Sequence, residues 1–187
     1  MKRLIDIILG LIAIIVFAIP MLIVSIAIKV NSQGPILFKQ KRIGKDGSHF
    51  EIYKFRSMYM ETPNVSTEAL GDPTAYITSV GKFIRKTSLD EMPQLFNILK
   101  GDMAVVGPRP ALYNQYELIA MRDEAGINRV RPGLTGYAQV MGRDLISDEK
   151  KVEYDKYYVD NYSILFDLKI LLMTVYSVAK ADGVKMK

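Results

Sequence analysis

The chain has 187 residues, enough for one domain with a substantial core, and it contains no cysteine and a single histidine. This composition excludes disulfides, a cysteine nucleophile and a zinc site of histidine and cysteine ligands, and it leaves a Ser-His-Asp triad dependent on His49. The formal net charge of +5 favours an anionic partner, whether nucleic acid, phospholipid head groups or a phosphorylated substrate.

The first predicted element is an apolar helix over residues 7–28, where 22 consecutive residues carry no charge. As a helix this run is roughly 33 Å long, which is enough to cross a bilayer. Pro20 lies inside it, and a proline there removes the hydrogen bond to Val16 and bends the helix. Basic residues stand on both sides of the run, at positions 2, 3, 29, 39, 41, 42 and 45.

These features favour a re-entrant segment over a straight span. A straight span would put one of the two basic clusters on the wrong face of the membrane, whereas a helix that bends at Pro20 and returns keeps both on the cytoplasmic side. We therefore expect re-entrant insertion. A single transmembrane span and a cleavable signal peptide, with Ser25-Ile26-Ala27 as its cleavage site, remain alternatives at this level.

Three shorter elements are predicted next. Two segments of mixed apolar and polar residues, 36–42 and 49–55, flank a turn sequence and predict a β-hairpin with Asp46-Gly47 at its turn. Residues 59–75 contain prolines and a glycine with few large apolar side chains, so we expect a mobile loop. Apolar residues at 80, 83 and 84 then predict a short helix that ends near Lys86.

A helix over about 90–100 follows, and it opens on two adjacent carboxylates, Asp90 and Glu91. Asp90 has an ordinary explanation, because aspartate is a preferred N-cap and Pro93 is best tolerated in a first helical turn. Ser88 with Glu91 gives a rival capping box. Capping therefore accounts for Asp90 about as well as catalysis does, and Glu91 on its own suits a first-turn charge.

Arg109 stands between two prolines, Pro108 and Pro110, which fix the backbone on both sides. Turns rarely need that rigidity, so an anion-binding role is favoured over a structural one. A carboxylate pair at a helix start and a rigidly held guanidinium together suit phosphate-ester chemistry, as nucleophile and charge clamp. For catalysis and phosphate binding, this composition leaves carboxylates, basic side chains, backbone amides and a hard cation such as Mg²⁺.

The remaining elements are mostly helical. No proline or glycine interrupts residues 111–125, which predict a helix, and a loop rich in proline and glycine follows at 131–136. Ser147 can cap a polar helix that runs to about Asn161. The apolar stretch 165–179, interrupted by two charges, is either a core helix or one that lies in the membrane interface.

Six ordered motifs resemble those of a known family. They are KFRSM at 54–58, VGKFIR at 80–85, TSLDEMPQL at 87–95, NILKGDM at 97–103, VGPRP at 106–110 and VRPGLTG at 130–136. The chain thereby resembles the bacterial sugar transferases, the monotopic phosphoglycosyl transferases that begin undecaprenyl-linked glycan assembly. The similarity covers essentially the whole chain, and its length is similar to the minimal form of the family, which includes the transferase of phospho-diacetylbacillosamine.

The resemblance implies a ping-pong reaction. Asp90 would attack the β-phosphate of a UDP-sugar and expel UMP, and polyprenyl phosphate would then take the sugar phosphate from the aspartate. Glu91 would assist, with Mg²⁺ held by Asp90 and Glu91. The positions that match the family's substrate site are Lys54, Arg56, Arg85, Pro108, Arg109, Pro110, Arg131, Gln139, Gly142, Arg143 and Asp155. Without the resemblance, Lys54, Arg56 and Arg85 would each be interpreted as solvated surface charges.

The resemblance also implies an α+β fold that is mostly helical. A re-entrant membrane helix kinked at Pro20 would occupy residues 1–33. A catalytic domain with a small β-hairpin and amphipathic interfacial helices would occupy residues 34–187, on the cytoplasmic face of the bacterial inner membrane. The partners would be a UDP-sugar, polyprenyl phosphate, the anionic bilayer, a second copy of the chain and downstream glycosyltransferases, and no nucleic acid is expected.

Three residues depart from the family's usual pattern. Ile19 precedes Pro20 where many relatives have serine, which removes a hydroxyl that could satisfy a freed backbone carbonyl. Tyr137 stands where tryptophan is common, and Met141 where asparagine often precedes Gly-Arg. Two other classes of function stay open from the residues alone. One is a catalytically silent scaffold on anionic lipid, and the other is a membrane-tethered nucleic-acid binder, for which the positive charge is too scattered.

Overall fold

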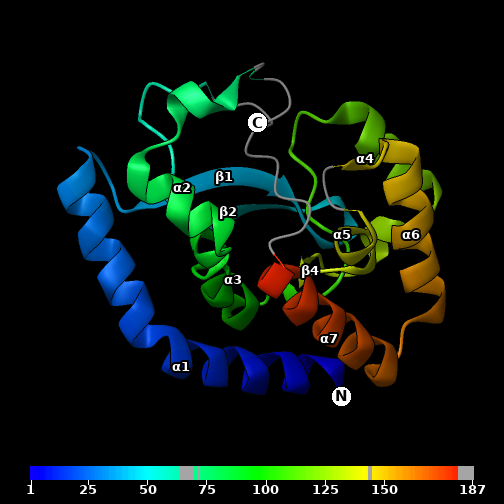
Figure 1. Cartoon of the computed structure of the whole chain (residues 1–187). Helices are drawn as coiled ribbons and strands as arrows, with labels where there is room; N and C mark the ends of the chain where they lie inside the picture. The colour runs from blue at the N-terminus through cyan, green and yellow to red at the C-terminus, as the bar shows by residue number, and fades with distance from the viewer. Residues whose placement is uncertain (64–69, 71, 143–144, 181–187) are drawn as a thin grey trace.

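The computed structural model describes residues 1–63, 70, 72–142 and 145–180 of the chain (Figure 1). It confirms a mostly helical α+β fold. The helices are α1 (Lys2–Asn31), α2 (Ser79–Lys86), α3 (Gln94–Lys100), α4 (Tyr116–Glu124), α5 (Tyr137–Met141), α6 (Asp148–Asn161) and α7 (Ile164–Lys180). The strands are β1 (Leu37–Ile43), β2 (His49–Phe55), β3 (Ala104–Val106) and β4 (Gly133–Thr135), and the 3-10 turns are η1 (Lys45–Gly47), η3 (Pro73–Tyr76), η4 (Leu89–Glu91) and η5 (Ile127–Arg129).

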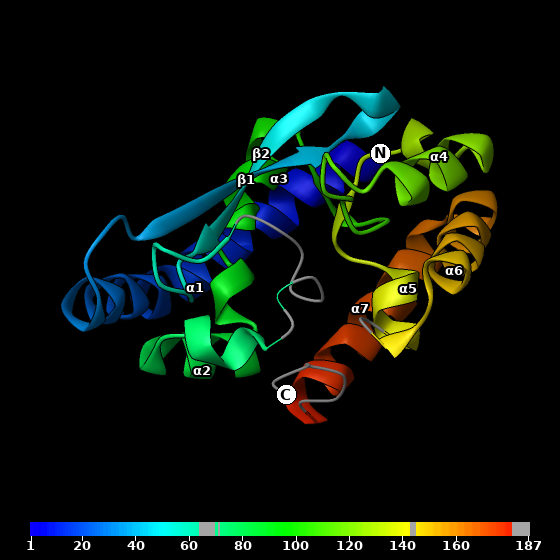
Figure 2. The ribbon, with the colours of Figure 1, turned by 90° about the horizontal axis from the view of Figure 1, so that it is seen from above.

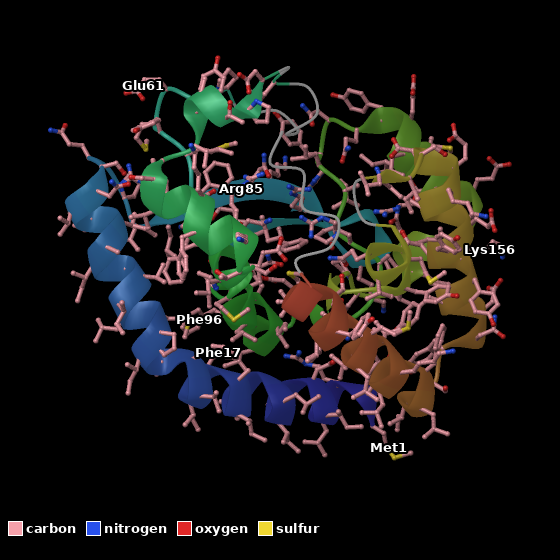
Figure 3. All side chains as sticks on the ribbon, in the orientation of Figure 1. Met1, Phe17, Glu61, Arg85, Phe96 and Lys156 are labelled. Carbon is pink, nitrogen blue, oxygen red and sulfur yellow. The ribbon has the colours of Figure 1, made fainter. Side chains whose placement is uncertain are left out.

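Helix α1 is a single helix of 30 residues that bends near its middle, where Pro20 lies (Figure 1). It is long and apolar enough to cross a membrane, yet just 11% of its most apolar stretch is buried against the rest of the structure. Figure 3 labels Phe17 at the bend and Phe96 on α3, the helix against which α1 packs most closely. Gly10 allows that approach, because a Cβ there would lie 3.3 Å from the Leu99 side chain.

The predicted β-hairpin is confirmed. Strands β1 and β2 pair in antiparallel register from Leu37 opposite Phe55 to Ile43 opposite His49. The turn includes Asp46, whose φ of 54° lies in the left-handed region that aspartate and asparagine tolerate better than most residues. Asn97 of α3 fixes the hairpin in place, because its side chain accepts from the Tyr53 amide at 3.0 Å and donates to the Glu51 carbonyl at 2.7 Å.

The short helix predicted to end near Lys86 is confirmed as α2, which Thr78 caps by accepting from the Gly81 amide at 2.9 Å. The mobile loop predicted for 59–75 lies partly outside the described residues, at 64–69 and 71. The part that is described contains η3, where Asp72 accepts from the Thr74 amide.

The helix predicted from residue 90 begins later. Residues 89–91 form η4, and α3 starts at Gln94 with Pro93 as its N-cap residue. Asp90 therefore caps neither element, and the capping explanation is wrong. The residue before η4, Ser88, has a φ of 57° and gives no side-chain cap, so the rival capping box is also absent. The C-terminal limit was predicted correctly, because Gly101 ends α3 in the left-handed conformation.

Three further elements differ from the prediction or extend it. The helix predicted for 111–125 begins at Tyr116, as α4. The loop predicted for 131–136 contains β4, which pairs in parallel with β3, and α5 follows it directly. The polar helix predicted to start after Ser147 is confirmed as α6, and the Ser147 hydroxyl accepts from the Lys150 amide at 3.4 Å.

The core has parts on either side of β3. Figure 2 shows α5, α6 and α7 grouped on one side and the hairpin with α2 and α3 on the other. Val105 of β3 packs against both of the buried clusters next to it, one around Ile98 and Met103 and one around Tyr158 and Ile170. This short strand therefore joins the two halves of the molecule.

Helix α7 confirms the core interpretation for one of its faces, and its place in a membrane interface stays a prediction. Ile170 is fully buried in the cluster beside β3, whereas Leu165, Leu168, Leu172 and Val175 are exposed. One face of the helix thus belongs to the core, and the other presents an apolar surface, as α1 does.

Candidate active site

Asp90 lies in η4, in the short connection between α2 and α3, and it is 8% exposed. Among the described residues, no group donates a hydrogen bond to its carboxylate. Burial raises the pKa of Asp90 to about 6, although the Lys54 ammonium acts in the opposite direction; the neighbouring Glu91 charge raises the pKa further. A buried carboxylate without donors keeps its lone pairs available, which suits a nucleophile.

Glu91 has a different environment from its neighbour. Its Oε1 accepts from Lys54 Nζ at 2.8 Å and from Arg109 Nη2 at 3.1 Å. Burial acts to raise the pKa of Glu91, but the Lys54 and Arg109 charges outweigh it and hold that pKa well below its usual range. Burial in turn lowers the pKa of Lys54, with Glu91 opposing. Glu91 is thus no solvated first-turn charge but the centre of a small ionic cluster.

The Pro108-Arg109-Pro110 turn is fixed through its main chain. The Pro108 carbonyl accepts from the Gly133 amide at 2.9 Å, next to the β3–β4 pair. The Pro110 carbonyl accepts from Arg42 Nη1 of β1 at 2.9 Å, and the Arg109 carbonyl accepts from Arg122 Nη1 of α4 at 2.6 Å. All three carbonyls therefore have donors from different elements, which leaves the Arg109 side chain as the projecting part of the turn.

Arg122 is a residue that the sequence interpretation missed. It is 4% exposed, and its Nη2 lies 2.7 Å from Oδ2 of Asp155, itself 1% exposed. Burial raises the pKa of Asp155 to about 6 against the opposing charge of Arg122. One signal was available, since Arg122 follows the apolar Leu118 by four residues and so shares the buried face of α4.

The structure brings together several of the predicted site residues. Asp90, Glu91, Lys54 and Arg109 form one cluster, and the Arg85 charge acts on Asp90. The Arg85 Nε is buried without a hydrogen-bond partner among the described residues. Asp155 is not hydrogen-bonded to this cluster directly but is connected to the Arg109 carbonyl through Arg122.

Other predicted residues have local roles in the structure. Arg56 is buried, and its terminal nitrogens donate to the carbonyls of Ser32 and Gln33, where α1 ends. Arg131 is exposed and donates through Nε to the Gly101 carbonyl at 2.8 Å. Neither is hydrogen-bonded to the carboxylate pair, so any contact of theirs with a substrate would be separate from it.

The last predicted residues lie around α5. Gln139 has a buried Oε1 without a hydrogen-bond partner in the described part of the chain, while its Nε2 donates to the Leu134 carbonyl at 3.4 Å. Gly142 follows the end of α5, where a Cβ would lie 2.4 Å from the Ile146 side chain. Arg143 lies outside the described residues.

The carboxylate pair provides oxygen donors of the kind that Mg²⁺ prefers. Glu91 Oε1 is already used by two cationic groups, which leaves its Oε2 and the Asp90 oxygens. The described residues contain no group of three or more histidine, cysteine or acidic side chains arranged to hold a metal. Mg²⁺ commonly binds with one or two carboxylates, completing its shell with water and substrate phosphates. The residues therefore fit a cation that a phosphate substrate helps to bind.

Comparison with known proteins gives consistent matches. A family model described as bacterial sugar transferase matches residues 1–181. The uncharacterized sugar transferase EpsL of Bacillus subtilis (strain 168) is 40% identical over 185 residues, which cover 99% of this chain and 90% of EpsL.

Two longer relatives are named for their activities. The UDP-glucose:undecaprenyl-phosphate glucose-1-phosphate transferase of Escherichia coli (strain K12) is 40% identical over 185 residues, covering 94% of this chain and 39% of that protein. The UDP-N-acetylgalactosamine-undecaprenyl-phosphate N-acetylgalactosaminephosphotransferase of Aeromonas hydrophila is 38% identical over 189 residues, covering 98% of this chain and 45% of that protein. The chain thus spans less than half the length of these two relatives.

Proposed function

The chain belongs to the bacterial sugar transferase family, and from this premise we propose that it transfers a sugar 1-phosphate from a UDP-sugar to undecaprenyl phosphate. The observation that carries the proposal is the pairing of a buried Asp90, to which no group in the described part of the chain donates, with a Glu91 held between Lys54 and Arg109. The activities for which the two longer relatives are named support the choice of donor and acceptor. The product would serve glycosyltransferases that extend the lipid-linked sugar.

In the first step, an oxygen of the Asp90 carboxylate attacks the β-phosphorus of the UDP-sugar. The bond from that phosphorus to the oxygen bridging the two phosphates breaks, and UMP leaves with the bridging oxygen. The sugar phosphate remains as an acyl phosphate on Asp90. In the second step, a phosphate oxygen of undecaprenyl phosphate attacks the same phosphorus and releases the carboxylate.

The basic residues stabilise the charge that moves in these steps. The backbone around Arg109 is fixed by its neighbouring prolines and by three main-chain hydrogen bonds, and its guanidinium donates to Glu91, so it can bind a phosphate with little further ordering. Lys54 and Arg85 add positive charge around Asp90. Glu91 holds Lys54 and Arg109 in place. We propose that Asp90 and Glu91 also hold Mg²⁺, which when bound would neutralise charge on the diphosphate.

We further propose that α1 is re-entrant, with both ends on the cytoplasmic face of the inner membrane. Near its start, Arg3 donates to the carbonyls of Ile98 and Leu99 at 2.6 and 3.0 Å. At its far end, Asn31 donates to Ser79 Oγ at 3.0 Å. Both ends thus contact one body, and a helix that crossed the bilayer would lose one set of these contacts. The bend at Pro20 supports the same arrangement.

UMP release from a panel of UDP-sugars tests the reaction, with the full chain held in nanodiscs. With Mg²⁺ and undecaprenyl phosphate present, we expect turnover with at least one sugar. Without undecaprenyl phosphate, we expect about one equivalent of UMP and a mass increase of one sugar phosphate on the peptide that contains Asp90.

The decisive variant is Asp90→Asn, which should abolish both UMP release and the mass increase. Asp46→Asn is the matched control, because it makes the same chemical change at an exposed turn whose left-handed backbone asparagine tolerates. Release of UMP by Asp90→Asn at the rate of the unaltered chain would contradict the proposed nucleophile. Failure with every donor, from folded protein, would favour a binding scaffold over an enzyme.

A further inference from the structure

Strand β3 has a polar partner on the side that faces away from β4. Ala104 and Val106 pair with β4, so the amide of the residue between them, Val105, points away from that strand. Its N–H donates to Asp6 Oδ1 at 3.0 Å, and Asp6 is 4% exposed. A carboxylate from the second turn of α1 thus occupies the position that a neighbouring strand would take.

The same end of α1 makes a second connection to β3. Lys2 is ion-paired with Asp167 of α7 and lies 3.2 Å from the Tyr158 hydroxyl. That hydroxyl donates to Asp167 Oδ1 at 2.7 Å and has the Val106 carbonyl 3.2 Å away as another acceptor. Burial, together with Asp167, raises the pKa of Tyr158, which keeps the hydroxyl protonated as a donor. Figure 1 shows the N-terminus beside the start of α7.

Membrane anchoring by α1 does not require the Asp6 carboxylate. The 22 residues after Asp6 carry no charge, and taking a carboxylate out of water is costly unless hydrogen bonds satisfy it. Asp6 makes its hydrogen bond to the strand that leads, after Gly107, into the Pro108-Arg109-Pro110 turn. The backbone at Gly107 is also held in place, because its amide donates to the Thr135 carbonyl at 2.9 Å. A shift of β3 would therefore pass directly to Arg109.

We propose that Asp6 is a positioning residue for Arg109: by binding the Val105 amide, the membrane helix fixes β3 and hence the guanidinium that binds the substrate phosphate. The effect on catalysis rests on the proposed function, whereas the effect on β3 does not. The membrane helix is then a working part of the active site as well as its anchor.

The first test measures amide hydrogen exchange of the full chain in nanodiscs, in peptides covering residues 104–110. Asp6→Leu keeps the size of the side chain and removes the acceptor. We expect exchange at Val105 to rise at least about tenfold, because the amide loses its partner. Ser25→Ala is the matched control, since it removes a hydroxyl in the same helix that bonds to Met21, far from β3. Unchanged exchange in Asp6→Leu would overturn the proposal.

The second test is a double-mutant cycle on kcat/KM for the UDP-sugar. We expect the single variant Asp6→Leu to lower kcat/KM about tenfold. In a chain that already carries Arg109→Ala, the same substitution should lower kcat/KM less than about twofold, because its effect acts through Arg109. Asp6→Asn, which keeps an oxygen acceptor, should restore most of the activity. Equal losses in both backgrounds would mean a general loss of structure and would overturn the positioning role.

Two outcomes separate the coupling from the proposed reaction. If the unaltered chain turns over no donor while exchange rises as expected, the proposed function fails and the link from α1 to β3 stands. If Asp6→Leu does not fold, Asp6→Ala removes the same acceptor from the Val105 amide with a smaller side chain. An Asp6→Ala variant with unchanged exchange at Val105 would overturn the proposal in that case.

Discussion

Two adjacent carboxylates in this chain have opposite electrostatic environments. Asp90 is buried, none of the residues that the structure describes donates to its carboxylate, and its pKa is raised, whereas Glu91 accepts from two cations and its pKa is lowered. Neighbouring groups with pKa values pushed apart can take different roles at one pH. At neutral pH both are ionised, but no described residue donates to Asp90, so the proposed nucleophile and the proposed charge-holding residue differ in environment rather than in residue type.

The raised pKa of Asp90 predicts how activity depends on pH. A carboxyl group is a nucleophile only when ionised, so kcat/KM for the UDP-sugar should fall as pH is lowered through about 6, by roughly tenfold for each pH unit below it. If Asp90 binds Mg²⁺, a higher Mg²⁺ concentration should move the inflection to lower pH, since a cation favours the ionised form. A pH series at two Mg²⁺ concentrations checks this, and a flat profile between about pH 5 and 7 would contradict it.

The buried ion pair of Asp155 with Arg122 predicts that a substitution of Asp155 lowers stability more than it affects substrate binding. Asp155→Asn leaves the buried Arg122 without its counter-charge, which should destabilise the fold by about 3 kcal/mol. Thermal unfolding in detergent micelles measures this. Asp160→Asn is the control on the same helix, because Asp160 is exposed and should change stability by less than about 0.5 kcal/mol. Lost activity with unchanged stability would instead place Asp155 in contact with substrate.

At the level of the elements, the hairpin and α6 were predicted correctly from the sequence, because the residues that indicate them are close together in the chain. The hairpin has its turn residues between two short strands, and α6 has Ser147 at its start. The β3–β4 pair could not be predicted in this way. Each strand has three residues, too few to show a period of two, and the partners lie 29 residues apart in the sequence.

The start of α3 was mispredicted for a reason that also concerns the site. Met92 and Pro93 both have helical backbone angles, but Pro93 has no amide N–H to donate, so η4 and α3 meet there without forming one continuous helix. The shift left Asp90 in a tight turn instead of at a cap. The ionic partners of Glu91 come from β2 and from the turn after β3, and these long-range contacts have no local sequence signal.

The close approach of β3 to β4 makes Gly107 a sensitive position. A Cβ at Gly107 would lie 2.6 Å from the Arg131 carbonyl oxygen and 2.9 Å from the Gly133 amide nitrogen, so the backbone would have to move. We expect Gly107→Ala to lower kcat/KM about a hundredfold, since it displaces the Arg109 turn. Steady-state kinetics in nanodiscs measures this. Gly10→Ala serves as the control, because its Cβ would meet the end of the flexible Leu99 side chain at 3.3 Å, and activity should persist.

At the scale of the whole molecule, the α+β class was predicted from the sequence, but the packing of α1 against the other elements was not. The proposed division into residues 1–33 and 34–187 stays a prediction. Within the described residues, α1 packs on α2, α3 and β3, so its contacts reach both halves of the core. Hydropathy reports that a helix is apolar, and it carries no information on which partners its few polar residues will find.

The re-entrant arrangement predicts the labelling of cysteines placed at the two ends of α1. The chain has no native cysteine, so one inserted after Met1 or introduced as Gln33→Cys is a unique label site. In intact spheroplasts, we expect a membrane-impermeant maleimide to label neither, and to label both once the membrane is opened. Labelling of one end alone in intact spheroplasts would show a spanning helix.

The contacts of Arg3 and Asp6 also bear on how the protein is made. They join residues 95, 96 and 99 positions apart in the chain. Ribosomes release the N-terminal segment first, so α1 meets the lipid while the strand and helix end that will secure it have yet to be synthesised. The nascent helix is thus held at first by its own apolar surface and flanking charges. Its final packing forms late, when α3 and β3 have been synthesised and can bind the N-terminal residues of α1.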